Sequence, residues 1–581
     1  MEPIRHECGI AMIRLRKPQA YYKEKYGDSS FGLDKLYLLM EKEYNRGQEG
    51  AGAGCMAIRS GEMRRVRAEG ADALHDIFRK IKREREAGET GFSGECYIGH
   101  LRYSTTGRSG LDHVHPFIYK GEKREESLML CGNFNLTNIE PSGERGAQKA
   151  DTAILLEEIA HAIKREGGAE KALRYLTPGW DGGYVLAGVT GRGEMWVMRD
   201  PHGIRPAYYH IDGEVIVAAS ERAAIQTVFN IEEQDVKELP RGHCLLVDEK
   251  GEASLIQIME QESESACSFE RIYFSRGTDS SIYRERKELG RLLAPAVMRS
   301  IGGDIDNTVF SFIPNTAEPA YYGLTEAVEE ILDSEKTEAA MQAGGDREAL
   351  KKIIGRRVRR EMAAVKDVTL RTFIAGEGRR DDLAEHVYDI TYGTLRRGKD
   401  NLVVVDDSVV RGTTLSRSII SMLDRLGPVK IVVASSSPQV RYPDCYGIDI
   451  PHLEELVAFR GAIELLKERK RENIIEAVYR RCKELQREGR DDTENCVRGI
   501  YEPFTDEEIS SKISEMLTPE ETGAKVEIVF QTIDAAHRAI PRHSGDWYFS
   551  GVYPTPGGYR TVNRSFTDYY ENRRGMPEPQ S

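Results

Sequence analysis

The sequence predicts two domains of different fold class, an α+β domain followed by an α/β domain. In the first 250 residues, short β-like runs such as 184–189 alternate with helical stretches at 31–44 and 151–165, which is typical of a layered α+β domain. After a polar boundary at 248–266, β-rich runs are separated by helical patterns, which indicates a parallel sheet wound with helices. Those runs lie at 306–313, 401–405 and 429–434. At about 150 residues per domain, a chain of 581 residues has room for both.

The composition is that of a globular protein and excludes several classes of partner. Hydrophobic residues make up 40% and charged residues 30% of the chain, which is enough for packed cores. The formal net charge of −13 leaves no overall basic field to hold a nucleic acid or an anionic membrane. No run approaches the roughly 18 apolar residues of a membrane span. We therefore expect a cytoplasmic protein with no nucleic-acid or membrane partner.

The nine cysteines are dilute and odd in number, and none forms a Cys-x-x-Cys pair. This pattern disfavours a disulfide framework or a zinc ribbon. A reducing compartment is the simpler interpretation, in agreement with the expected location.

The remaining segments are read mainly from charge. Residues 325–366 are dense in Glu, Lys, Arg and Ala and predict a charged helix with a solvated face. A second charged helix is predicted over 454–487, and the sequence shows no regular pattern beyond 490. We assign residues 456–581 to a C-terminal helix and tail of unknown role.

The most informative motif is residues 401–414, NLVVVDDSVVRGTT. A β-branched strand ends in Asp406 and Asp407, and a loop containing Gly412 then opens a helix. Such a loop directs backbone N–H groups at one place, where a phosphate binds. The acid pair would repel that phosphate but suits sugar hydroxyls or magnesium beside it. The motif predicts a phosphorylated sugar as ligand; the alternative is an ordinary strand, Asx turn and capped helix.

This loop resembles the phosphoribosyl pyrophosphate loop of type I phosphoribosyltransferases, in the form found in the amidophosphoribosyltransferase family. Further segments match that family in the right order: ACSFERIYFSR at 266–276, FIPNTA at 312–317, RTFI at 371–374, SSP at 436–438 and YGID at 446–449. The resemblance implies a parallel-sheet phosphoribosyltransferase domain over 265–455. It implies that phosphoribosyl pyrophosphate is bound by Asp406, Asp407, Ser408, Val409, Val410, Arg411, Gly412, Thr413 and Thr414. It also implies a magnesium ion held by Thr316, Asp406 and Asp407.

By the same resemblance, residues 8–255 are a class II glutamine amidotransferase domain, an N-terminal nucleophile αββα sandwich. Cys8 would be its nucleophile, and the α-amine of the same residue would be the base. That pairing requires Cys8 to be the first residue, so residues 1–7 are predicted to be a propeptide that is removed. NRGQE at 45–49, RDPHGIRP at 199–206 and ASE at 219–221 complete the domain signature.

Two segments carry the other amidotransferase site residues implied by the resemblance. GHLRYST at 99–105 supplies Arg102, whose planar fork suits the glutamine α-carboxylate, and Thr105 beside it. Asp151 would bind the α-ammonium group. GNFNLTN at 132–138 resembles the oxyanion loop, in which the Asn133 side chain and the Phe134 N–H stabilise the tetrahedral intermediate. Relatives usually have Gly where Phe134 stands, so Phe134 is strained if that position needs a positive φ.

The implied reaction is hydrolysis of glutamine and transfer of ammonia to phosphoribosyl pyrophosphate, giving 5-phosphoribosylamine, glutamate and pyrophosphate. This is the first step of de novo purine synthesis. The resemblance further implies Mg2+, an internal ammonia path, purine nucleotide regulators and a homo-oligomer. An iron–sulfur cluster is not expected: Cys267 and Cys445 match two of the ligands of iron–sulfur members, but the later Cys-x-x-Cys pair is absent.

Two alternatives remain open at the sequence level. The first is a paralogue that binds phosphoribosyl pyrophosphate or a nucleotide, with weak or lost transferase activity. It would explain why the closing segment at Arg379 and Arg380 matches the family poorly, and why Asn315 stands where the family often has Asp. A glutamine-dependent sugar-phosphate aminotransferase would share the first half but needs isomerase domains, and the loop from Asp406 to Thr414 argues against it.

Overall fold

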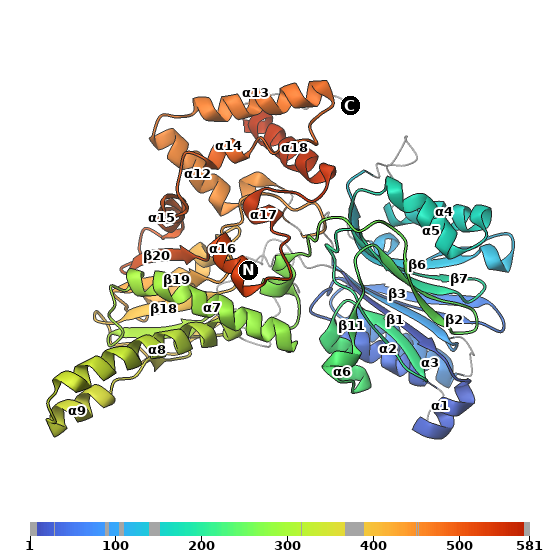
Figure 1. The fold of residues 1–581 in the computed structure, drawn as a ribbon, viewed down its shortest axis with the longest axis horizontal. Coiled ribbons are helices and arrows are strands. Elements are labelled where there is room, and N and C mark those ends of the chain that lie inside the picture. Colours follow the sequence, from blue (N-terminus) through green and yellow to red (C-terminus); the bar gives the residue numbers. More distant parts are fainter. Residues whose placement is uncertain are drawn as a thin grey trace.

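The computed structural model describes residues 8–27, 30–87, 92–103, 110–138, 151–314, 316–366, 388–448, 450 and 452–573. Figure 1 shows two bodies side by side, the first half of the chain in one and the second half in the other.

The first half is built on two antiparallel sheets. The seven-stranded sheet has the order β11 (Lys237–Glu238), β9 (Tyr208–Ile211), β10 (Val215–Ala219), β1 (Gly9–Leu15), β4 (Cys96–Arg102), β2 (Gly50–Ala57) and β3 (Glu62–Glu69). The six-stranded sheet has the order β13 (Ala253–Gln257), β12 (His243–Val247), β8 (Met195–Arg199), β7 (Gly182–Thr190), β6 (Leu128–Leu136) and β5 (Phe117–Tyr119).

Helices cover the outer face of each sheet. One set comprises α1 (Gln19–Tyr26), α2 (Phe31–Lys42), α3 (Ala73–Glu86) and α6 (Arg222–Phe229), and the other α4 (Asp151–Glu166) and α5 (Ala169–Leu176). In β1, Ile10 and Met12 pack between the two sheets, while the alternate Ala11 and Ile13 pack under the first set of helices. Because both faces of β1 are covered, its sequence is continuously apolar. The predicted αββα sandwich is confirmed.

The second half is built on one five-stranded parallel sheet. Its order is β15 (Arg359–Arg360), β14 (Thr308–Phe312), β18 (Asn401–Asp406), β19 (Lys430–Ser435) and β20 (Lys525–Phe530). Val403 and Val405 face the helices α7 (Ser280–Ser300) and α8 (Glu318–Gln342), and Leu402 and Val404 face the opposite core. A small antiparallel pair, β16 (Ala364–Lys366) and β17 (Tyr388–Ile390), lies apart from this sheet. The predicted α/β class is confirmed.

The charged segments differ from the prediction in continuity. The segment 325–366 is not one helix: α8 begins at Glu318 and ends at Gln342, and α9 (Arg347–Ile354) follows Gly344 and Gly345, whose φ values of +57° and +89° a helix cannot contain. The segment 454–487 is likewise two helices, α12 (Val457–Glu468) and α13 (Asn473–Glu488). The sequence pattern predicts the charged surfaces of these helices but not the turn that divides each segment into two helices.

The C-terminal segment is part of the second body. β20 pairs with β19 along six residues, so the expected domain end at residue 455 does not fit the observed sheet. The remaining helices of the second half, several of which gather beyond the sheet in Figure 1, are α11 (Ile420–Asp424), α14 (Arg498–Tyr501), α15 (Asp506–Leu517), α16 (Ile533–Ala539), α17 (Trp547–Ser550) and α18 (Pro556–Arg573). Trp547 is only 1% exposed, and its indole N–H donates to the Asp444 carboxylate at 2.7 Å. Across the described ranges, no helix has the length and apolar character needed to cross a lipid bilayer.

Replacing Trp547 tests whether the C-terminal segment stabilises the second body. Trp547→Ala should lower the free energy of unfolding by about 3–5 kcal/mol, because it leaves a cavity and removes the indole donor from Asp444. Val552→Ala is the matched control, since Val552 is 54% exposed and its loss should cost less than about 0.5 kcal/mol. Urea denaturation measures both. A loss below about 1 kcal/mol for Trp547→Ala would show that residues beyond 455 are dispensable for stability.

Candidate active site

Cys8 lies immediately before β1, at the end of the sheet where β4 also ends. The antiparallel register pairs Gly9 with Leu101, which brings Cys8 next to Arg102. The Cys8 Sγ donates to the Tyr103 carbonyl at 3.9 Å. Burial raises the pKa of the Cys8 thiol, against the opposing effects of this hydrogen bond and of the Arg102 charge. The thiol is therefore protonated at neutral pH and needs a base before it can act as a nucleophile.

The predicted oxyanion residues lie on β6. Asn133 is 5% exposed and pairs with Val185 of β7, and Phe134 pairs with Tyr184 in the next register position. Phe134 is not strained: within the described ranges the residues other than Gly with positive φ are Asn230 and Lys470. A side chain larger than Gly is therefore compatible with this strand.

His115 links the oxyanion strand to the start of α4, a role that the sequence analysis missed. The Gly132 N–H donates to His115 Nδ1 at 3.2 Å, which leaves the hydrogen on Nε2 to reach Thr152 Oγ1 at 2.9 Å. Gly132 precedes Asn133, and Thr152 follows Asp151. The imidazole thus sets the spacing between two predicted glutamine-binding segments. A histidine before a proline, lying between the Arg102 segment and β6, is the only sequence signal for it.

Several predicted residues lie outside what the structure describes. These are the propeptide 1–7, Thr105 within 104–109, the side chain of Asp151, Asn315, the RTFI segment with Arg379 and Arg380 within 367–387, and Asp449.

The 401–414 motif forms the expected strand, loop and helix start. β18 ends at Asp406, the loop from Asp407 to Thr414 follows, and a π-helical turn over Leu415–Ile419 leads into α11. Residues 406–415 and 419 line one cavity together with Tyr273. Gly412 has a φ of +74°, and a Cβ there would lie 2.7 Å from a Leu517 methyl, so the loop requires glycine. All nine predicted ligand residues of this loop thus surround one cavity.

Within the loop, the Arg411 side chain turns toward Glu455. Its Nε lies 2.8 Å from Glu455 Oε2, so the guanidinium is held by a carboxylate. The Arg411 backbone N–H stays within the loop, where backbone N–H groups bind phosphate at other such loops.

The acid pair is crowded. Asp406 is 6% exposed, and burial together with the neighbouring Asp407 raises the pKa of its carboxyl well above the usual range. Asp407 and Thr316 line one cavity of about 660 Å3, whose wall on the side of the first half includes Asn45 and Gln48. A bound cation would reduce the repulsion between the two carboxylates. The two carboxylates and the Thr316 hydroxyl are oxygen ligands of the kind that Mg2+ prefers, and Mg2+ usually takes its remaining ligands from the substrate. Within the described ranges, no group of three or more His, Cys, Asp or Glu side chains gathers as a metal site.

The cysteines considered for an iron–sulfur cluster lie in two different surroundings. Burial raises the pKa of Cys267 to about 12, and its Sγ lies 3.4 Å from the Tyr548 hydroxyl. Burial also raises the pKa of Cys445 well above its usual value. Cys482 instead donates to Asn563 Oδ1 at 3.7 Å. Iron ligation requires thiolates, and the expectation that no cluster forms stays a prediction.

The buried histidines should make the first half sensitive to acid. Burial lowers the pKa of His100 to about 3 and that of His115 well below its usual value, so both stay neutral in the folded state while the unfolded chain binds protons below about pH 6.5. Stability is therefore present above pH 6.5 and is lost as the pH falls, by up to about 1.4 kcal/mol per pH unit for each histidine. Thermal unfolding of His115→Asn should show a weaker loss between pH 7.5 and 5.5 than the parent. His161→Asn, on the exposed side of α4, should behave as the parent, and an unchanged slope in His115→Asn would contradict the assignment.

Comparison with known proteins agrees with the motifs of the sequence. No family model matches the chain. The amidophosphoribosyltransferase of Bacillus subtilis is 28% identical over 480 residues, covering 80% of this chain and 86% of that protein. That of Archaeoglobus fulgidus is 26% identical over 442 residues, covering 74% and 84%.

Among solved structures, glutamine phosphoribosylpyrophosphate amidotransferase from B. subtilis complexed with ADP and GMP superposes with a TM-score of 0.63 at 23% identity, covering 94% of this chain and 97% of that one. A structure described as the allosteric regulatory enzyme of purine biosynthesis gives 0.65 at 24% identity, covering 94% and 96%. Both support the fold. The resemblance of this chain to amidophosphoribosyltransferases, which its motifs predict, is thereby confirmed over most of its length.

Proposed function

We propose that this chain is a glutamine-dependent amidophosphoribosyltransferase. Glutamine is hydrolysed at Cys8, and the ammonia displaces pyrophosphate from C1 of phosphoribosyl pyrophosphate to give 5-phosphoribosylamine, the first step of de novo purine synthesis. The observation that carries the proposal is the cavity lined by Asn45 and Gln48 from one half and by Thr316 and Asp407 from the other. Asn45 and Gln48 flank Arg46, which contacts Cys8. Asp407 begins the phosphate loop, so the shared cavity supports transfer of ammonia from one site to the other.

In the first half, removal of residues 1–7 frees the Cys8 α-amine to take the proton of its own thiol. Arg102, Thr105 and Asp151 hold the two charged ends of glutamine, and Asn133 with the Phe134 N–H receives the oxyanion. Arg102 is buried and Asn133 is 5% exposed, so these interactions act where water does not weaken them.

In the second half, the nine loop residues from Asp406 to Thr414 bind phosphoribosyl pyrophosphate. Backbone N–H groups of Arg411 to Thr414 hold the 5′-phosphate, and the acid pair faces the ribose hydroxyls. Magnesium, held by Thr316, Asp406 and Asp407, would neutralise pyrophosphate charge when bound. Ammonia is already a nucleophile, so this site needs to exclude water and supplies no base.

We also propose the wider setting of the enzyme. The amidotransferase domain spans residues 8–255, and the transferase domain begins at 265 and extends beyond 455, because β20 completes its sheet. We propose a cytoplasmic homo-oligomer regulated by purine nucleotides. The B. subtilis structure with ADP and GMP supports such regulation.

Replacing the nucleophile should separate the two activities. Cys8→Ala should abolish glutamine-dependent pyrophosphate release, with glutamate formation lost as well, while ammonia-dependent release stays within about twofold, because Cys8 takes no part in the attack at C1. Intact mass of the parent should show a chain that begins at Cys8. Loss of both activities in a folded variant would contradict the division of labour. A parent that binds phosphoribosyl pyrophosphate but never turns over would favour the non-catalytic paralogue.

The acid pair and the loop should fail differently. Asp407→Asn keeps the phosphate cradle but removes charge beside the metal, so turnover should fall more than affinity. Thr413→Val removes a hydroxyl on the phosphate side, so affinity itself should fall roughly ten- to a hundredfold, as expected for a lost hydrogen bond to a charged group. Calorimetric titration with phosphoribosyl pyrophosphate, with and without magnesium, measures both. Unchanged affinity in Thr413→Val would remove the 5′-phosphate from that part of the loop.

A further inference from the structure

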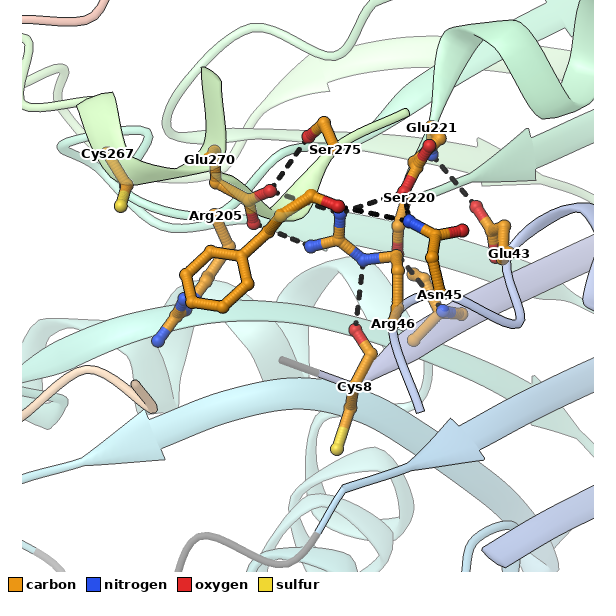
Figure 2. A network of polar contacts seen from close by, with 12 residues as sticks. Cys8, Glu43, Asn45, Arg46, Arg205, Ser220, Glu221, Cys267, Glu270 and Ser275 are labelled. Atoms are coloured by element: carbon orange, nitrogen blue, oxygen red, sulfur yellow. Dashed lines mark hydrogen bonds and ion pairs between the residues drawn. The ribbon is translucent and has the colours of Figure 1, made fainter. Parts of the chain in front are cut away.

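Arg46 joins the backbone of Cys8 to the second half of the chain. Its side chain is completely buried, and its Nε donates to the Cys8 carbonyl at 3.4 Å (Figure 2). Its two terminal nitrogens donate to the two oxygens of Glu270, at 3.0 Å and 2.5 Å. Glu270 lies in the second half, 224 residues further along the chain. A bidentate pair of this kind fixes the plane of the guanidinium as well as its position.

Glu270 is in turn held by its own half. It begins the five-residue π-helical turn Glu270–Phe274, and the hydroxyl of Ser275 donates to Glu270 Oε2 at 2.8 Å. The Ser275 carbonyl accepts from Arg286 Nη2 at 2.7 Å. Arg286 and Asp407 line the same cavity of about 660 Å3. The turn that carries Glu270 is therefore anchored at the wall of the proposed phosphoribosyl site.

The carboxylate of Glu221 also contacts Arg46 and completes the polar network around it. Glu221 Oε1 accepts from Asn45 at 2.7 Å and from Arg46 at 3.3 Å, while Glu221 Oε2 accepts from the Arg276 N–H at 3.0 Å. Asn45 also donates to the Phe274 carbonyl at 3.0 Å. Asn45 and Glu221 thus bridge the two halves, and Figure 2 shows both side chains beside Arg46.

The electrostatics keep the central pair ionised. Burial alone would raise the pKa of Glu270, but Arg46, together with Arg205 and the Ser275 hydroxyl, outweighs it and holds that pKa below its usual value. Glu43, which accepts from the Glu221 N–H at 2.8 Å, has its pKa raised well above the usual range by burial and by Glu221. Glu270 faces Arg46 through both of its oxygens. Removing its charge leaves a buried cation with poorer compensation, which is costly.

We propose that Glu270 is a positioning residue for Cys8: the transferase half holds Arg46, and Arg46 holds the carbonyl of the nucleophile. The proposal rests on the proposed role of Cys8. The Cys8 Cα is bonded to the carbonyl carbon and carries both the α-amine and the side chain with the thiol. A tilt of the Arg46 guanidinium therefore moves the nucleophile and the base together. A misplacement of about 1 Å can cost a hundredfold in rate.

The test is Glu270→Gln, which keeps the shape and removes the charge. Glutaminase kcat should fall about ten- to a hundredfold with the KM for glutamine within about threefold, and ammonia-dependent synthesis should be unchanged. Asp279→Asn is the matched control, because Asp279 also pairs with an arginine of the other half, Arg222, at 2.6 Å, but does not contact Arg46. It should retain both activities within about twofold. Equal glutaminase rates in the two variants would overturn the proposal.

A second measurement separates positioning from a field effect. Alkylation of Cys8 by iodoacetamide across pH should have a lower midpoint in Glu270→Gln, because the Arg46 charge near the thiol is less compensated, while turnover falls. A raised midpoint large enough to account for the lost turnover would overturn positioning. If the parent hydrolyses no glutamine, the proposed function fails, yet alkylation still decides: an alkylation rate of the ionised Cys8 at high pH that is equal in Glu270→Gln and the parent would show that Glu270 does not position Cys8.

A milder variant covers the case in which Glu270→Gln does not fold. Ser275→Ala keeps the ion pair and removes one donor to Glu270 Oε2. It should lower glutaminase kcat about two- to fivefold and leave ammonia-dependent synthesis intact. No change in kcat would overturn the proposal.

Discussion

The arrangement of the two halves depends on charge buried between them. Arg46 is completely inaccessible, and it is surrounded by carboxylates that reach it from both halves. A buried cation is tolerated only where its partners are fixed, because breaking one side of such a pair leaves an uncompensated charge at a cost of several kcal/mol. The ion pair therefore helps to fix the relative placement of the halves, in which Gln48 and Asp407 line one cavity.

Each half is stiff for a different reason. In the first, two sheets are covered on both faces, so alternate residues of one strand stabilise two different cores. In the second, the parallel strands bury both faces, and the C-terminal segment adds the edge strand β20 and the indole of Trp547. Rigid elements of this kind hold Cys8 directly before β1, Asn133 within β6 and Asp406 at the end of β18.

Parts of the site were predictable from sequence because they are local. The residues from Asp406 to Thr414 are consecutive, and a strand, a glycine turn and a helix start set most of their mutual geometry. Gly412 confirms this, since its positive φ is demanded by the turn itself. The helix breaks at Gly344 and Gly345 were also visible in the sequence, but the surrounding charge pattern obscured them.

Other parts could not be predicted, because they depend on contacts between distant segments. β20 is a six-residue strand in a segment that reads as tail, and its identity follows from pairing with β19. His115 gains its role from Gly132 and Thr152, which approach it only when β6 and α4 pack together. The sequence by itself determined the two fold classes and the phosphate loop, because periodicity and turn chemistry are properties of neighbouring residues. Only the tertiary structure decided that Glu270 holds Arg46 beside Cys8, because no local preference relates residues 224 positions apart.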